Sequence, residues 1–218
     1  WYRMFWERNV PLDILHEDHM DASSLAGYRL VVLPFPAALS RNARQALAEY
    51  VRGGGTIVSD PYFCPYTDNF YLDTRVPGGG FDEIFGCRER DIRRAEAGVE
   101  VRHEGRTYRV SGSHFREEFT LRGGTAVADY ADGTGPAAVA NAWGSGQAII
   151  LGINLGLAYS PGLGVGDDFV RGGSAEASAD ARSLAMAIIR PLGIEGAFRS
   201  DCPDIRGGFL RGPDAEDL

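Results

Sequence analysis

The sequence predicts a three-layer α/β fold with a mainly parallel sheet and an antiparallel hairpin extension. Residues 28–60 read as a buried strand, an amphipathic helix and a second buried strand. Residues 99–110 and 137–153 each read as two short strands joined by a glycine-containing turn. With 218 residues, 44% of them hydrophobic, the chain is long enough to bury one main core. We therefore expect one main domain.

The strand–helix–strand unit has the clearest signals. Residues 30–33 form a continuous apolar run, which is typical of a strand covered on both faces. Ser40 is a suitable N-cap, and five apolar residues follow at helical spacing: Ala43, Ala46, Leu47, Tyr50 and Val51. Glycines 53–55 end this helix before the second strand over residues 56–58. The pattern predicts a right-handed βαβ unit.

The residues before this unit predict two further elements. Residues 1–9 read as the last turns of a helix with an aromatic face, which Asn9 ends. Residues 12–15 read as a short strand. Because a domain of this class rarely begins inside a helix, we expect a first strand upstream of Trp1.

Beyond residue 60 the pattern is looser but still divides into elements. It predicts, in order, a long loop over 61–80, a short helix over 81–85 that Gly86 stops, a hairpin over 99–110 with Gly105 in its turn, a strand over 125–130, a turn at 132–133, a hairpin over 137–153 and a helix over about 178–190. From residue 199 to 218 the composition becomes polar and rich in Gly and Pro, which predicts a linker or the start of another domain. We place the main domain at residues 1–198.

Charge and composition exclude several classes of function. The net charge is −8, and all 22 basic residues are arginines. An acidic chain without a basic cluster argues against nucleic acid as the main partner. The lack of lysine removes Schiff-base and P-loop chemistry. No apolar run is long enough to span a bilayer, and no signal-peptide pattern is present, so we expect neither a membrane span nor secretion.

The three cysteines indicate a reducing compartment. Cys64, Cys87 and Cys202 are odd in number, far apart, and without the spacing of a zinc site. We interpret them as reduced thiols in a cytoplasmic protein and expect no metal or other cofactor.

The order of segments resembles one known family. The segments are VPLDIL, LAGYRLVVLPFPAALS, ALAEYVRGGGTIVSD, VPGGGFDEIFG and GPAAVANAWGSGQAIILGINLG, and the resemblance covers roughly residues 1–195. It is similar to the middle, or trimerisation, domain of family 42 β-galactosidases. The resemblance implies the fold of class I glutamine amidotransferases, which is related to flavodoxin-like sheets. It also implies a catalytic (β/α)₈ barrel before this domain and a small β-sandwich after it.

The resemblance implies that catalysis takes place elsewhere. In that family both catalytic carboxylates lie on the barrel, so no residue of this chain inherits either role. Working amidotransferases place a cysteine on the tight turn after the strand equivalent to residues 56–58. Here that turn is Ser59-Asp60-Pro61, and Cys64 follows without the expected flanking glycines. We expect Cys64 to be idle, since an activated thiol needs a base and an electropositive setting.

Two other segments resemble ligand sites. One loop contains His16, Glu17, Asp18, His19 and Asp21, which could offer two or three metal ligands. A solvated loop is the simpler interpretation, and a sugar-facing or subunit-facing role is favoured over metal binding because the loop should lie at the carboxyl end of the sheet. Glycines 162, 164 and 166 resemble a phosphate-binding loop. Two aspartates follow them and would repel phosphate, so we interpret this segment as a flexible loop.

The aromatic loop after residue 60 is the leading candidate for a functional surface. It contains Tyr62, Phe63, Tyr66, Phe70 and Tyr71. Such residues either form a satellite core under the loop or contact another domain or subunit, where aromatic side chains often dominate the binding energy.

We therefore predict a non-catalytic oligomerisation domain of a β-galactosidase-like glycoside hydrolase. Its partners would be its own barrel and its sister subunits in a homotrimer, and a galactoside would be reached only through the barrel. The alternative is a stand-alone amidotransferase-like enzyme or small-molecule binding domain. The missing cysteine on the turn argues against the enzyme.

Overall fold

A computed structural model describes residues 1–67, 69–95, 98–111, 113, 115–159 and 175–196. The fold is mixed α/β. The elements are, in chain order, α1 (Tyr2–Trp6), η1 (Glu17–His19), α2 (Ala22–Leu25), β1 (Leu30–Leu33), α3 (Arg41–Arg52), β2 (Thr56–Ser59), α4 (Phe81–Ile84), β3 (Cys87–Arg94), β4 (Val99–His103), β5 (Arg106–Val110), β6 (Phe115–Leu121), β7 (Thr125–Tyr130), β8 (Pro136–Trp143), β9 (Gly146–Leu151), α5 (Leu155–Ala158), α6 (Ala175–Ile189) and η2 (Arg190–Leu192).

The main sheet combines parallel and antiparallel strands. Within the described residues it has seven strands in the order β1-β2-β9-β8-β7-β4-β5. Only the β1–β2 and β2–β9 pairs are parallel, and the other four pairs are antiparallel. The expectation of a mainly parallel sheet is therefore wrong. The predicted hairpins do extend the sheet with antiparallel strands, and β9 of the second hairpin pairs in parallel with β2.

The predicted βαβ unit is confirmed. Leu30 of β1 pairs with Thr56 of β2 in parallel, and α3 connects the two strands. Ser40 caps α3, since its hydroxyl accepts a hydrogen bond from the Ala43 N–H at 3.3 Å. The five predicted apolar residues of this helix are all buried. The helix ends at Gly53, as the glycine run predicted.

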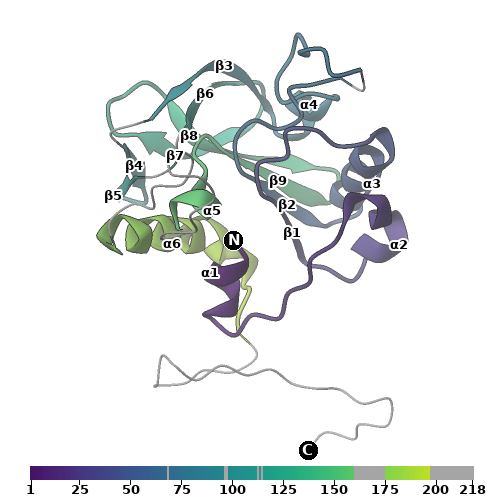
Figure 1. Ribbon diagram of the computed structural model, residues 1–218, viewed down its shortest axis with the longest axis horizontal. Coiled ribbons are helices and arrows are strands. Elements are labelled where there is room, and N and C mark those ends of the chain that lie inside the picture. The colour runs from purple at the N-terminus through teal and green to yellow at the C-terminus, as the bar shows by residue number, and fades with distance from the viewer. Residues whose placement is uncertain (68, 96–97, 112, 114, 160–174, 197–218) are drawn as a thin grey trace, which may run out of the picture.

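Helices cover both faces of the sheet. The side chains of β2 alternate between the faces, so Val58 joins one buried cluster and Ile57 the other. The first cluster includes side chains of α1, α5 and α6, and the second includes those of α2, α3 and α4. Figure 1 shows α1 and α6 on one side of the parallel strands and α2 and α3 on the other. The core thus consists of two apolar layers separated by the sheet.

Two strands form a second sheet that sequence analysis missed. β3 pairs with β6 in antiparallel fashion, with an irregularity between Glu89 and Asp91. Their sequences, CRERDIRR and FREEFTL, are too charged to show the usual apolar alternation. Charge pairing stabilises them instead: Glu118 on β6 lies 2.5 Å from Arg90 and 2.9 Å from Arg93 on β3.

The chain before β1 differs from expectation at one element. α1 is present, and Asn9 has the left-handed backbone (φ 56°) of a helix stop. Residues 12–15, however, are not a strand. Ile14 is 81% exposed, and no described strand pairs with this segment. A strand needs a neighbouring strand to pair with its backbone N–H and C=O groups, and this segment has none among the described strands.

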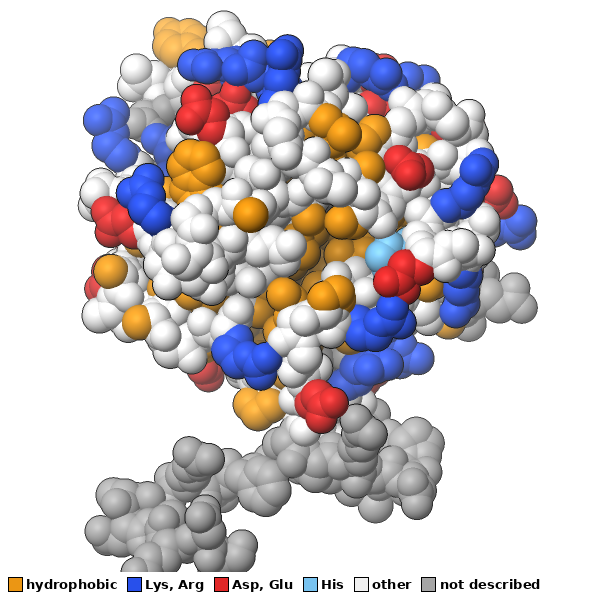
Figure 2. Space-filling model, turned by 180° about the vertical axis from the view of Figure 1, so that it is seen from behind, with side chains coloured by type: hydrophobic (Ala, Val, Ile, Leu, Met, Phe, Trp, Pro, Cys, Tyr) orange, Lys and Arg blue, Asp and Glu red, His pale blue; other side chains and the backbone are white. Residues whose placement is uncertain are grey.

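The surface also carries hydrophobic side chains. Seen from behind, they gather in a hollow near the centre of the face, with many of the charged side chains around it (Figure 2). None of the described helices combines the length and the hydropathy that crossing a bilayer requires.

Candidate functional site

An aromatic cleft lies where β1 and β2 end. It is a cavity of about 240 Å³, and we call it the aromatic cleft. The cleft is lined by Phe35, Tyr62, Ile92, Arg93, Arg94 and Phe115. The ring of Phe35 stacks on Tyr62 with centroids 5.6 Å apart and on Phe115 with centroids 6.2 Å apart. The carboxyl ends of parallel strands are where open α/β sheets usually bind their ligands and partners.

The backbone of the cleft is strained. Phe35 has φ 48° and Tyr62 has φ 70°, a left-handed conformation that bulky side chains rarely adopt. Such conformations persist only where surrounding contacts enforce them, and they gather at functional sites. One enforcing contact is known for Tyr62, whose backbone N–H donates to the Glu117 carboxylate at 2.7 Å.

Glu117 belongs to a pair of buried acids next to the cleft. Its side chain is fully buried and hydrogen-bonded to that of Glu89. Burial raises the pKa of both carboxyls, and the charge of Glu89 raises that of Glu117 further. Two carboxyls in hydrogen-bond contact share a proton, because they cannot both ionise at low cost. The pair therefore favours its protonated form more than an exposed carboxyl does.

Asp60 is a third buried acid, directly after β2. Its side chain is fully buried, and Oδ2 accepts a hydrogen bond from the Trp1 indole N–H at 2.8 Å. Burial raises the pKa of Asp60 to about 7, against the lowering effect of the Trp1 bond. The second oxygen, Oδ1, has no hydrogen-bond partner within the described residues. Asp60 lies in the turn over residues 59–61 that sequence analysis compared with the cysteine turn of amidotransferases.

Cys64 does not replace that nucleophile. Its side chain is fully buried, and burial raises the pKa of the thiol to about 12. A protonated, inaccessible thiol cannot attack a carbonyl carbon at neutral pH. The structure therefore supports the expectation that Cys64 is idle.

The aromatic loop divides into an anchor and a tip. Phe63 is fully buried against Phe81 and Phe85, at centroid distances of 4.5 and 5.1 Å. Its assignment as an interface residue is corrected, because it belongs to the core of this chain. Tyr66 lies edge-on to Tyr62, with their hydroxyl oxygens 3.3 Å apart.

The tip of the same loop is the part open to solvent. Phe70 is 77% exposed, Tyr71 74% and Leu72 66%. We call these three residues the apolar tip. Sequence analysis missed Leu72, although its position directly after Phe70 and Tyr71 was a usable signal.

Side chains of the loop over residues 16–21 form hydrogen bonds with nearby backbone groups. His16 caps η1 by accepting from the Asp18 N–H, and Asp21 caps α2 by accepting from the Ser23 and Ser24 N–H groups at 2.9 and 2.8 Å. Glu17 accepts from the Ser40 N–H at 3.3 Å. Among the described residues, no group of three His, Cys, Asp or Glu is arranged to hold a metal ion. The sugar-facing role of these residues stays a prediction.

Two predicted segments cannot be placed. Glycines 162, 164 and 166 and the tail over 199–218 lie outside the residues that the structure describes.

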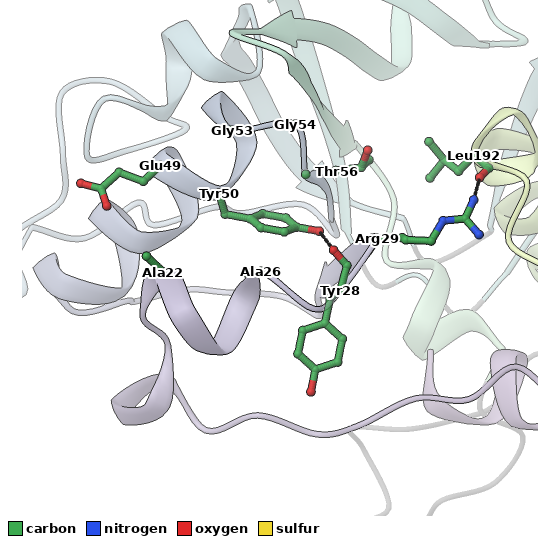
Figure 3. A pocket seen from close by; sticks show the side chains of 11 residues that line it. Ala22, Ala26, Tyr28, Arg29, Glu49, Tyr50, Gly53, Gly54, Thr56 and Leu192 are labelled. Carbon is green, nitrogen blue, oxygen red and sulfur yellow. Dashed lines mark hydrogen bonds between the residues drawn. The ribbon is translucent and has the colours of Figure 1, made fainter. Parts of the chain in front are cut away.

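A larger open cavity of about 560 Å³ lies at the opposite, amino end of β1 and β2. Tyr50 points across it and donates to the Tyr28 carbonyl oxygen at 3.0 Å, and Arg29 donates to the Leu192 carbonyl oxygen at 2.6 Å (Figure 3). These polar groups thus tie α3 and η2 to the start of β1. We interpret the cavity as a structural gap between elements.

Comparison with known proteins places these features in context. The family model described as the β-galactosidase trimerisation domain matches residues 1–163. No curated protein matches the chain. Among solved structures, the cold-adapted β-galactosidase from Rahnella sp. R3 is similar with a TM-score of 0.71 and 20% identity, over 93% of this chain and 28% of that one. A catalytic mutant of Gan42B, a GH42 β-galactosidase from G. stearothermophilus, is similar with a TM-score of 0.68 and 20% identity, over 89% of this chain and 25% of that one.

A third similar structure has a different length. A cytoplasmic protein from Salmonella typhimurium LT2 gives a TM-score of 0.57 at 12% identity, over 89% of this chain and 85% of that one. At these identities all three likenesses show the fold alone. The chain spans only about a quarter of the length of the two β-galactosidases.

Proposed function

This chain belongs to the β-galactosidase trimerisation domain family, and on that premise we propose that it is the non-catalytic oligomerisation domain of a β-galactosidase-like glycoside hydrolase. The observation that carries the proposal is the family match over residues 1–163 of 218. The short coverage of the similar β-galactosidases supports it, because it leaves room in such enzymes for a separate catalytic domain.

The partners follow from the same premise. We propose that the chain holds its own catalytic barrel and two sister subunits together in a homotrimer in the cytoplasm. A galactoside would be bound by the barrel. We also propose that residues 1–198 form the oligomerisation domain and that residues 199–218 lead towards a further domain.

The relation to amidotransferases is part of the proposal. Helices on both faces of the β1–β2–β9 strands support a relation to flavodoxin-like and class I glutamine amidotransferase-like folds. On this relation the turn after β2 would correspond to the one that carries the catalytic cysteine in amidotransferases, and here it carries the buried Asp60. An oligomerisation role needs no nucleophile at this position.

Molar mass tests the proposal. Light scattering on the full-length natural protein is expected to give three times the mass of one subunit over a wide range of dilution. A monomer at every concentration would contradict the proposal.

A further inference from the structure

We propose that, in the trimer, the apolar tip of one subunit docks into the aromatic cleft of the next subunit. This inference rests on the proposed function, since it names the two surfaces that would meet. A closed ring of three identical subunits requires a head-to-tail contact, in which each subunit offers two different patches. The tip and the cleft supply one convex and one concave patch of the same apolar character.

The apolar tip is built to project and to keep its shape. The Thr67 N–H donates to the Tyr71 carbonyl oxygen at 2.8 Å, and the Phe70 N–H donates to that of Thr67 at 2.9 Å. Tyr66 and Leu72 form a β-bridge at its base. In Figure 1 the segment between β2 and α4 extends beyond α4, away from the rest of the chain. A segment already held in one conformation loses little entropy when it binds.

The apolar side chains of the tip are not buried within their own subunit. Phe70 and Tyr71 each keep about three quarters of their surface exposed, so they do not fill their own aromatic cleft. Exposed large hydrophobic residues that adjoin one another mark interaction sites more often than isolated ones do. No other three consecutive residues in the described part of the chain are large, hydrophobic and exposed.

The aromatic cleft favours an apolar occupant over a sugar or an anion. The Tyr62 hydroxyl already contacts that of Tyr66, and the Arg93 guanidinium lies 3.0 Å from Asp91 and 2.9 Å from Glu118. A sugar would require hydrogen-bonding groups that are not already engaged. The aromatic rings and Ile92 that line the cleft instead fit aromatic and aliphatic side chains.

The charged side chains next to the two surfaces are of opposite sign, so they do not oppose the contact. Arg93 and Arg94 lie at the cleft, and Asp73 directly follows the tip.

The test uses the full-length natural protein and two variants. Phe70→Ser removes the most exposed side chain of the tip, and Ile92→Gln places a polar amide in the cleft. We expect each to raise the concentration at which half of the trimer dissociates by at least tenfold, measured by analytical ultracentrifugation. Ile14→Ser is the matched control, since Ile14 is 81% exposed but belongs to neither surface. Thermal unfolding checks that each variant is folded.

A mixture of the two variants tests the pairing itself. A Phe70→Ser subunit keeps its cleft and an Ile92→Gln subunit keeps its tip, so one intact contact per pair is possible. The 1:1 mixture is therefore expected to form dimers at concentrations where each variant alone is a monomer. If both variants remain trimeric like the unchanged protein, or if only one of them dissociates, the inference is wrong while the proposed function stands. If the unchanged protein is a monomer, the proposed function itself fails.

Discussion

Near the carboxyl end of β2, three acidic residues have perturbed pKa values. Asp60, Glu89 and Glu117 are acids whose burial raises their pKa values. Glu117 contacts the backbone of Tyr62, whereas Asp60 contacts the indole of Trp1. Glu117 thus fixes the backbone of the cleft, and Asp60 ties the turn after β2 to the first residue of the chain.

Asp60 should make stability depend on pH in a specific direction. Its pKa is 3.8 in the unfolded chain and about 7 in the folded one, so the folded state holds the proton more tightly. Its contribution is therefore fully present below about pH 4 and is lost as the pH rises towards 7. The difference corresponds to on the order of 4 kcal/mol.

The measurement is urea unfolding of this chain and of Asp60→Asn across that range. Relative to the variant, the unchanged chain should lose stability from about pH 4 to about 7 and then level off. Asp132→Asn is the control, because the Arg116 hydrogen bond lowers the pKa of Asp132 to about 2, below this range. Parallel pH profiles for the unchanged chain and Asp60→Asn would show that the Asp60 carboxyl does not hold its proton in the fold.

The segment between β2 and α4 has a buried part and an exposed part. Its first part is an anchor, because Phe63 packs under α4 against Phe81 and Phe85. Its middle part is the exposed apolar tip. The anchor fixes the place from which the tip projects, so stability and recognition are divided between neighbouring residues.

Two matched substitutions should separate these tasks. In this chain, Phe63→Ala leaves a cavity in the core and should lower the free energy of unfolding by about 3–5 kcal/mol. Phe70→Ala changes an exposed side chain and should alter it by less than about 0.5 kcal/mol. Urea unfolding at one pH gives both values, and equal effects would contradict the division into anchor and tip.

At the scale of the whole molecule, this chain has the features of an assembly domain. The turn after β2 carries no thiol, and the buried thiol of Cys64 stays protonated. The apolar tip and the aromatic cleft both present apolar side chains, which suits them to contact with a second protein chain. Activity would then depend on a domain outside this chain.

The isolated chain should accordingly be inactive. We expect no hydrolysis of a chromogenic galactoside by this chain, whereas the full-length natural protein should hydrolyse it. Host β-galactosidase is excluded by expression in a strain that lacks it. Turnover by the chain alone, in proportion to its concentration, would contradict an oligomerisation role.

The local elements with strong periodic signals can be predicted from the sequence. The βαβ unit, the two hairpins, the short helix before Gly86 and the last helix each follow from apolar spacing, a cap or a glycine turn, which act between near neighbours in the chain. The order of these segments also carried the resemblance to the trimerisation domain, which the family model confirms.

Long-range packing sets how the predicted pieces join and which aromatic residues face solvent. The β2–β9 and β4–β7 pairs join the βαβ unit and the hairpins into one sheet, and no local signal in the sequence specifies these two pairings. β3 and β6 are strands because arginines and glutamates on the two segments meet across them, although each segment alone looks merely charged. In the same way, Phe63 and Phe70 are alike in sequence. Only the position of α4 determines that one is buried and the other is free to bind a partner.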